Sequence, residues 1–146
     1  MQQLYSWPMS TSTQIRTGRH VVYSLHAHLV FVTKYRRAVF TKAMLERMEE
    51  IGASVCEDFE CSLEEFDGEG DHVHLMVHYP PKVCLSKLVN SLKSVSSRML
   101  RTEFKKSIHK CLWKNVLWLP SYFVASCGGA PISIIREYIQ SQATPD

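Results

Sequence analysis

The residues of this chain that could do chemistry begin with two histidines, His72 and His74, in the run DHVHLMVHYP. The run alternates as a β-strand does, and residues two apart in a strand point to the same face of the sheet. Two neutral imidazoles held side by side on a rigid strand are a good start to a divalent-metal site. Without further ligands, the pair is explained as readily by a solvated strand face or by hydrogen bonds to neighbours.

A tyrosine and a glutamine near the C-terminal end could complete such a site. Tyr138 and Gln142 are four residues apart, so they share one face of a helix. A tyrosine can attack a phosphodiester and form a covalent phosphotyrosine link, although its ordinary pKa near 10 makes it a weak nucleophile. A divalent ion held by His72, His74 and the side-chain oxygen of Gln142 would polarise and orient the phosphate. Taken alone, the tyrosine and glutamine are also what ordinary helix packing produces.

The choice of metal and the remaining histidines leave alternatives open. Two imidazole nitrogens and one neutral oxygen suit Mn²⁺ better than Mg²⁺, although phosphate oxygens could complete the coordination of Mg²⁺. His26 and His28 repeat the same spacing in an earlier strand, but they lack a downstream partner motif, so we expect packing or DNA contact there. His78 lies on the same strand face as His72 and His74, and we expect it either to lie beside the metal site or to be exposed.

The elements that must position these residues alternate along the chain. A strand over 20–34, rich in β-branched and aromatic residues, leads to a helix that Thr41 caps and that runs to Phe59. A hairpin follows, with strands over 61–66 and 72–78 joined by a glycine-containing turn over 67–70.

The second half repeats this alternation. It predicts a helix over 87–104 capped by Ser86, a short strand over 121–126 and a last helix over 132–142, in which Ile132, Ile135 and Ile139 form an apolar stripe. The order is β-α-β-β-α-β plus one helix. It predicts an α+β fold of the ferredoxin-like type, an antiparallel sheet with helices on one face and the tyrosine on the additional C-terminal helix.

Length and composition are those of one globular domain. The 146 residues are 45% hydrophobic and 21% charged, and no apolar run approaches the roughly 20 residues that span a bilayer. We expect a flexible N-terminal lead over residues 1–19 and a single domain over 20–146. The five cysteines are scattered without a CxxC pair, which is typical of free thiols in a reducing cytoplasm.

Basic side chains are unevenly distributed although the formal net charge is only +3. The acids concentrate between Glu46 and Asp71, and the bases in KYRR (34–37) and between Lys82 and Lys114. Such asymmetry suggests one positive face, suited to a polyanion, or else a solvated helix face. The candidate DNA contacts are Lys34, Arg36, Arg37, Lys87, Lys93, Arg98, Arg101, Lys105 and Lys106. Tyr35, Trp113 and Trp118 could stack on unpaired bases, although tryptophan in a small domain is more often core.

Five segments together resemble one known family, the small single-tyrosine transposases of the IS200/IS605 insertion sequences. These enzymes carry a histidine–hydrophobic–histidine (HUH) motif. The segments, which cover roughly residues 20 to 142, are HAHLVFVTKYRRAVF (26–40), DHVHLMV (71–77), LVNSLKSVSSRML (88–100), LWLPSYFVASCGG (117–129) and IREYIQSQ (135–142). The combination of DHVHL with SYF and YI-x-x-Q is specific.

The resemblance implies a function and a set of roles. The family's metal ligands fall on His72, His74 and Gln142, with Mg²⁺ or Mn²⁺ as the ion, and its nucleophile falls on Tyr138. Such enzymes cleave single-stranded DNA beside imperfect hairpins at the element ends, leave a 5′-phosphotyrosine link, and need no nucleotide cofactor. They act as homodimers in which the tyrosine helix can complete the partner's site, and Gly128-Gly129 is either its hinge or an ordinary turn.

Two other functions remain open at this point. One is a domesticated relative that processes genomic palindromes with the same residues. The other is a non-catalytic single-strand-binding module, which would bind DNA without Tyr138 or metal and would form no covalent adduct.

Overall fold

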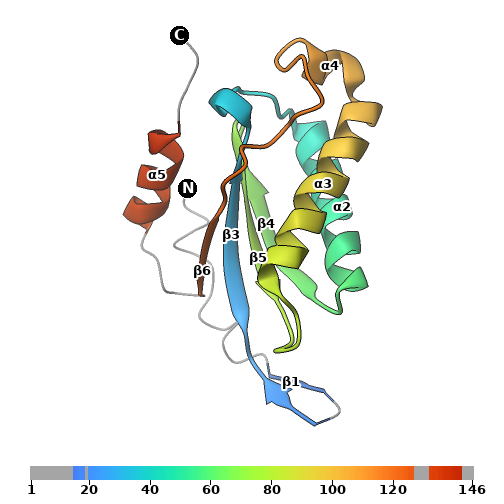
Figure 1. The fold of residues 1–146 in the computed structure, drawn as a ribbon, viewed down its shortest axis with the longest axis vertical. Coiled ribbons are helices and arrows are strands. Elements are labelled where there is room, and N and C mark those ends of the chain that lie inside the picture. Colours follow the sequence, from blue (N-terminus) through green and yellow to red (C-terminus); the bar gives the residue numbers. More distant parts are fainter. Residues whose placement is uncertain (1–14, 19, 127–131, 143–146) are drawn as a thin grey trace.

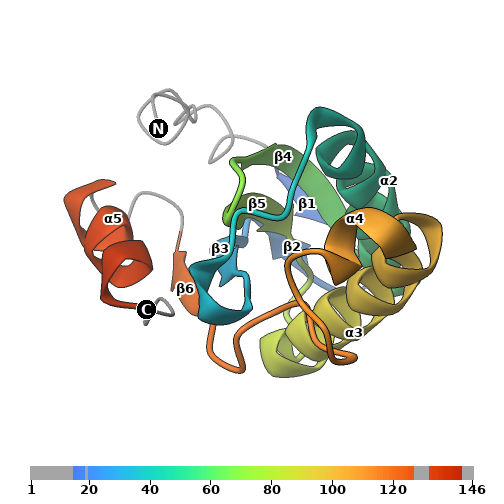
Figure 2. The same cartoon turned by 90° about the horizontal axis from the view of Figure 1, so that it is seen from above.

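The computed structural model describes residues 15–18, 20–126 and 132–142, and it has three layers (Figures 1 and 2). A four-stranded antiparallel sheet, in the order β4-β5-β3-β6, lies in the middle. Helices α2 and α3 cover one face, and helix α5 lies on the other. This strand order and the element order βαββαβ make the expected ferredoxin-like α+β fold, with the additional helix at the C-terminal end.

The two central strands are β3 (His26–Val32) and β5 (His72–His78), and they pair along their whole length. Every residue in both strands is buried. Alternate residues of β3, including Leu29 and Phe31, join the large core beneath the helices, whereas Val30 and Val32 face the other way. The predicted strand over 72–78 is confirmed with its bounds. Its hairpin partner is β4 (Ser62–Gly68), which extends through Asp67 and Gly68, so the first half of the predicted turn over 67–70 is strand instead.

The first strand begins later than the sequence indicates. The predicted strand over 20–34 divides into β2 (Val22–Tyr23) and β3, and β2 pairs instead with β1 (Arg16–Thr17) in a small separate sheet. β-Branched and aromatic residues continue through the segment, so composition alone does not mark the change of partner. The hairpin projects beyond the end of the main sheet at which β3 begins (Figure 1).

The helices of the core layer are α2 (Lys42–Asp58) and α3 (Leu85–Glu103), with a short α4 (Lys105–His109) after them. Thr41 caps α2 as predicted, because its side chain accepts a hydrogen bond from the backbone N–H of Met44 at 3.3 Å. The predicted cap of α3 is wrong. The N-cap is Cys84, which gives no side-chain cap, and Ser86 lies inside the first turn, where its hydroxyl pairs with the thiol of Cys84.

Helix α5 (Ile132–Ser141) follows β6 (Phe123–Ser126) and lies on the sheet face that α2 and α3 leave free. Ile135 and Ile139 are buried against Val30 and Val32, so the expected apolar stripe does hold the helix to the sheet. The side chain of Ile132 and the glycines Gly128 and Gly129 lie outside the described residues.

Candidate active site

His72 and His74 lie at the start of β5, on the sheet face that also carries α5. Their imidazole rings meet edge to face, with centroids 4.8 Å apart. Both residues are buried, His74 almost completely. Since strand pairing on both sides fixes the backbone of β5, the pair is held side by side as its spacing predicts.

Two carboxylates flank His72, and the sequence analysis did not single out either of them. The Nδ1 atom of His72 lies 2.7 Å from Oδ1 of Asp71, and its Nε2 atom lies 3.3 Å from Oε2 of Glu69. A carboxylate bonded to one ring nitrogen fixes the tautomer and leaves the other nitrogen available as a ligand. The bond to His72 also holds the pKa of Asp71 below its ordinary value.

The environment of His74 keeps its ring neutral. Burial, and then the nearby imidazoles of His72 and His28, lower the pKa of His74 to about 3. A neutral imidazole is the form that binds a metal ion, so no proton must leave before ligation at neutral pH.

Tyr138 does not face this pair in the described arrangement. Its hydroxyl is hydrogen-bonded to Oγ of Ser121 at 2.9 Å, and its ring lies 5.6 Å from the ring of Phe123. Both neighbours belong to the β6 side of the sheet. Burial raises the pKa of Tyr138, and the bond to Ser121 only partly opposes this. The phenol of Tyr138 is therefore protonated in this position.

Gln142 stays with Tyr138, as the four-residue spacing predicts. Its side-chain Nε2 donates to the backbone carbonyl of Tyr138 at 2.9 Å. The amide thus closes the end of α5. In the described arrangement, the structure keeps the two histidines together and the tyrosine and glutamine together, but as two separate pairs.

A cavity of about 200 Å³ separates α5 from the histidine strand. On the sheet side it is lined by Glu69, Asp71 and His72, together with Arg36. On the helix side it is lined by Arg136, Ile139 and Gln140, and not by the tyrosine. A different hollow, between α5 and β6, contains Tyr138.

The residues beside the cavity fit a divalent ion. The adjacent imidazoles of His72 and His74 supply nitrogen, and Glu69 adds an oxygen next to His72. Carboxylate oxygen suits Mg²⁺ and Mn²⁺ better than an amide oxygen does. The carboxylate of Glu69 is more exposed than the histidines, with 58% of its side-chain area accessible, so it can turn toward a ligand.

Arg36 connects the histidine strand to the helix. Its guanidinium pairs with Asp71 at 3.4 Å and donates to the backbone carbonyl of Gln140 at 3.2 Å. Arg36 and its neighbour Tyr35 both have positive φ angles, 55° and 59°. Such backbone angles are uncommon outside glycine and mark a site where the surroundings impose a conformation.

The residues predicted to contact DNA differ in exposure and in the hydrogen bonds that they make within the protein. The half-buried ammonium of Lys93 donates to three backbone carbonyls, those of Leu119, Pro120 and Ser121. These bonds use all three of its donors, which leaves none for phosphate in this arrangement. The exposed residues of the set are Arg37, Lys87, Arg98, Lys105 and Lys106.

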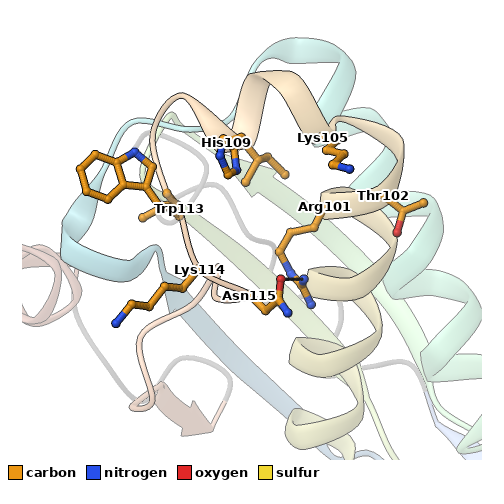
Figure 3. A pocket seen from close by; sticks show the side chains of 9 residues that line it. Arg101, Thr102, Lys105, His109, Trp113, Lys114 and Asn115 are labelled. Atoms are coloured by element: carbon orange, nitrogen blue, oxygen red, sulfur yellow. Dashed lines mark hydrogen bonds between the residues drawn. The ribbon is translucent and has the colours of Figure 1, made fainter.

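A basic hollow of about 300 Å³ lies where α3, α4 and the following loop meet (Figure 3). Arg101 and Lys105 border it from the helices, and Trp113 and Lys114 border it from the loop. Arg101 is hydrogen-bonded to Oδ1 of Asn115 at 3.2 Å, which holds the loop against the helix. The ring of Trp113 is 80% exposed.

The three aromatic residues predicted to stack on bases differ in burial. Trp118 is a core residue, since it is 7% exposed and its ring nitrogen donates to Ser96. The expectation that it could stack on DNA bases is therefore wrong in this arrangement. Trp113 and Tyr35 are both exposed and remain candidates.

Some predicted residues lie beyond these two pairs. His26, His28 and His78 are all buried on the same sheet face as His72 and His74, so His78 is not exposed.

The four described cysteines are free thiols, as expected, and Cys127 lies outside the described residues. Among the described residues, no helix is long and apolar enough to cross a membrane.

Three comparisons with known proteins agree on one family. A sequence model described as "Transposase IS200 like" matches residues 21–142. The chain is 28% identical to the ISDra2 transposase TnpA of Deinococcus radiodurans over 88% of this chain and 91% of that one. It is 30% identical to the transposase for insertion sequence element IS200 of Salmonella typhimurium, over 87% of this chain and 82% of that one.

Solved structures agree with the fold. A crystal structure of a candidate transposase from Deinococcus radiodurans superposes with a TM-score of 0.79 at 29% identity, covering 89% of this chain and 99% of that one. A REP-associated tyrosine transposase bound to a REP hairpin superposes with a TM-score of 0.54 at 11% identity, covering 87% and 69%. At that identity the second likeness concerns the fold alone.

Proposed function

The chain belongs to the family of IS200-like transposases, and from that membership we propose that it cleaves and rejoins single-stranded DNA at insertion-sequence ends. The observation that carries the proposal is the buried histidine pair on β5: Asp71 orients His72, which borders a cavity beneath the helix of Tyr138, and burial keeps His74 neutral. We expect the protein to act on DNA in the cytoplasm.

Tyr138 is the proposed nucleophile. Its oxygen attacks the phosphorus of the scissile phosphodiester, and the bond from phosphorus to the 3′ oxygen breaks. The products are a 5′-phosphotyrosine link and a free 3′-OH: the phenol gives its proton to solvent, and the departing 3′ oxygen takes one proton from solvent. Attack of a 3′-OH on the phosphotyrosine link rejoins DNA and regenerates the tyrosine, so no nucleotide cofactor is needed.

The proposed metal site consists of His72, His74 and Gln142, with Glu69 as a further oxygen donor. When bound, Mg²⁺ or Mn²⁺ would withdraw charge from the phosphate and orient it for in-line attack. Asp71 holds the ring of His72 through Nδ1, which leaves Nε2 available as a metal ligand. Burial keeps His74 neutral at the pH of the reaction.

The tyrosine must leave Ser121 before this chemistry can occur. In the described arrangement Tyr138 borders the hollow beside β6, while Arg136, Ile139 and Gln140 face the cavity of His72. We propose that α5 is repositioned, either over its own sheet or over the sheet of a second copy in a homodimer. The small apolar contact of α5, with two buried isoleucines, is consistent with either movement.

The basic hollow bordered by Arg101, Lys105, Trp113 and Lys114 is the proposed contact for the DNA hairpin. Lysine and arginine there can bind phosphates, and the exposed indole of Trp113 can stack on an unpaired base. This surface lies on the helix layer, away from the face that carries the histidine pair.

A covalent-adduct assay tests the chemistry. Wild-type protein is mixed with Mg²⁺ or Mn²⁺ and single-stranded oligonucleotides covering the flanks of its element, and adducts are separated on a denaturing gel. We expect an adduct with single strands and metal, and none with EDTA, with double-stranded DNA or in Tyr138→Phe. The exposed Tyr35→Phe is the matched control and should retain the adduct. Hairpin binding without any adduct would instead support a non-catalytic binding module.

A mixing experiment separates the two ways of assembling the site. Tyr138→Phe and the double variant His72→Ala/His74→Ala are each expected to be inactive. If α5 serves the partner subunit, mixing and re-equilibrating the two proteins restores cleavage in the mixed dimers. If each helix serves its own sheet, the mixture stays inactive, because no subunit then has both halves.

A further inference from the structure

A second group of possible metal ligands lies at the opposite end of β5 from His72. It consists of His26, Glu64 and His78, whose ligand atoms all lie within 4.8 Å of one another. These residues come from three adjacent strands, β3, β4 and β5, at the end of the sheet nearest the β1–β2 hairpin (Figure 1). Because a strand rises about 3.3 Å per residue, His78 stands about 13 Å from His74 along β5.

Strand register brings the two imidazoles together. His26 is directly opposite His78 in the β3–β5 ladder, and the rings are stacked with centroids 4.3 Å apart and an interplanar angle of 13°. Glu64 joins them because β4 has a bulge between Leu63 and Glu65. A bulge re-aims the side chain of the extra residue, and Oε1 of Glu64 lies 3.6 Å from Nδ1 of His78.

The two histidines are buried, Glu64 is partly buried, and the group is incompletely hydrogen-bonded. His26 is 6% exposed and His78 is 1% exposed. Within the part of the chain that the structure describes, Nε2 of His26, Nε2 of His78 and Oε1 of Glu64 have no hydrogen-bond partner. A buried polar atom without a hydrogen-bond partner costs about 1–3 kcal/mol. Each of the three residues carries one such atom, and the residues come together from three neighbouring strands, which favours a ligand here.

A cation of the chain itself already lies against the group. Nε of Arg16 donates to Nδ1 of His78 at 2.9 Å, and Nη2 of Arg16 is 3.8 Å from Oε1 of Glu64. The guanidinium is therefore a stand-in for a positive ion between the imidazole and the carboxylate. About half of the Arg16 side chain is exposed, so it can turn into solvent if another cation takes its place.

We propose that His26, Glu64 and His78 form a second metal site, specific for Zn²⁺ or a similar borderline ion, which Arg16 closes when the ion is absent. Two nitrogens and one carboxylate oxygen are a donor set that zinc uses, with water as the fourth ligand. Tetrahedral zinc holds its ligand atoms about 3.4 Å apart, so binding requires the group to contract and the two stacked rings to turn toward the ion. Without phosphate oxygens to complete its coordination, Mg²⁺ competes poorly for a site with two imidazoles.

The protonation state of the group agrees with this assignment. Burial lowers the pKa of His78 to about 4 and also lowers that of His26. Both rings are therefore neutral near pH 7, the form in which imidazole ligates zinc.

Zinc titration in a background without the proposed catalytic ligands tests the site. The double variant His72→Ala/His74→Ala should bind one equivalent of Zn²⁺, measured by equilibrium dialysis with elemental analysis, and should give a tetrahedral Co²⁺ spectrum. Adding Glu64→Gln should weaken zinc binding by about tenfold or more. Adding Glu65→Gln, the next residue on β4 and outside the group, should leave it unchanged. Adding Arg16→Gln should strengthen binding, because it removes the competing cation.

Three results would overturn the site: no zinc binding in the double variant, equal binding in the Glu64→Gln and Glu65→Gln proteins, or no effect of Arg16→Gln. If the double variant does not fold, the wild-type protein replaces it, with two equivalents expected and one of them lost on Glu64→Gln. Since no step requires DNA or activity, this outcome is independent of whether the protein cleaves DNA.

Discussion

The two pairs of residues proposed to share one reaction are held in the fold very differently. His72 and His74 belong to a central strand that pairs on both sides and is buried at every position. Tyr138 belongs to helix α5, and Gln142 follows the last residue of that helix; the helix meets the sheet through a small cluster, with Ile135 and Ile139 as its buried residues. The first pair is fixed by the whole sheet, whereas the second depends on a few local contacts.

This difference indicates how the nucleophile can be held away from the metal ligands before DNA binds. A rigid strand preorganises the metal ligands, which a site needs to within about 0.5 Å. A weakly docked helix can keep the phenol bonded to Ser121 until DNA arrives. Arg36, which bonds both Asp71 and the backbone near the end of α5, is a polar contact between the histidine strand and the helix.

Undocking the helix should give the largest stability difference between the two parts. Ile135→Ala removes a buried side chain, which costs about 2–4 kcal/mol. We expect hydrogen exchange in α5 to accelerate strongly while β5 stays protected, as read by mass spectrometry of peptides from each element. Ile134→Ala, at an exposed position of the same helix, should change little. Equal acceleration in β5 would mean that helix and sheet unfold as one unit.

Removing the carboxylate that is hydrogen-bonded to His72 should have the next largest effect, on metal affinity. Asp71→Asn removes the carboxylate that orients His72 and should lower metal affinity about 10–100-fold. Isothermal titration with Mn²⁺ measures this change. Asp58→Asn, at the exposed end of α2, is the matched control. Unchanged Mn²⁺ affinity in Asp71→Asn would show that strand pairing alone orients the ring.

Acid should lower the stability of the sheet more than that of the helix. The expected change in free energy per pH unit is smaller than in the two preceding predictions. Burial lowers the pKa of His28 to about 4, from an ordinary value near 6.5. Between these values the unfolded chain binds a proton that the folded chain does not. Stability is therefore full above pH 6.5 and falls as the pH decreases toward 4, by up to about 1.4 kcal/mol per pH unit for this residue.

Denaturant unfolding measured between pH 7 and pH 4.5 checks the acid effect. His28→Asn should make the dependence of the unfolding free energy on pH less steep. His109→Asn, at an exposed position after the core helices, should not. Parallel curves for wild type and His28→Asn would refute the assignment.

The strands and core helices were predictable because local patterns and burial agree there. The strand over 72–78 alternates with period two, and Thr41 has the side chain that an N-cap needs. The start of β3 was not predictable, because the same kinds of residue continue into β2 and only the partner strand changes. That Ser86 does not cap α3 was also not predictable, since a serine near a helix start can be the N-cap or lie within the first turn.

Sequence alone determined that His72 and His74 share a face, that Tyr138 and Gln142 share another, and that the elements follow the order βαββαβ. Those relations depend on the periods of strand and helix, which are local. The tertiary structure alone decided that Asp71 and Glu69 flank His72, that Ser121 holds Tyr138, and that Glu64 meets His26 and His78. These contacts depend on register, a bulge and helix docking, which arise only when residues far apart in the chain are packed together.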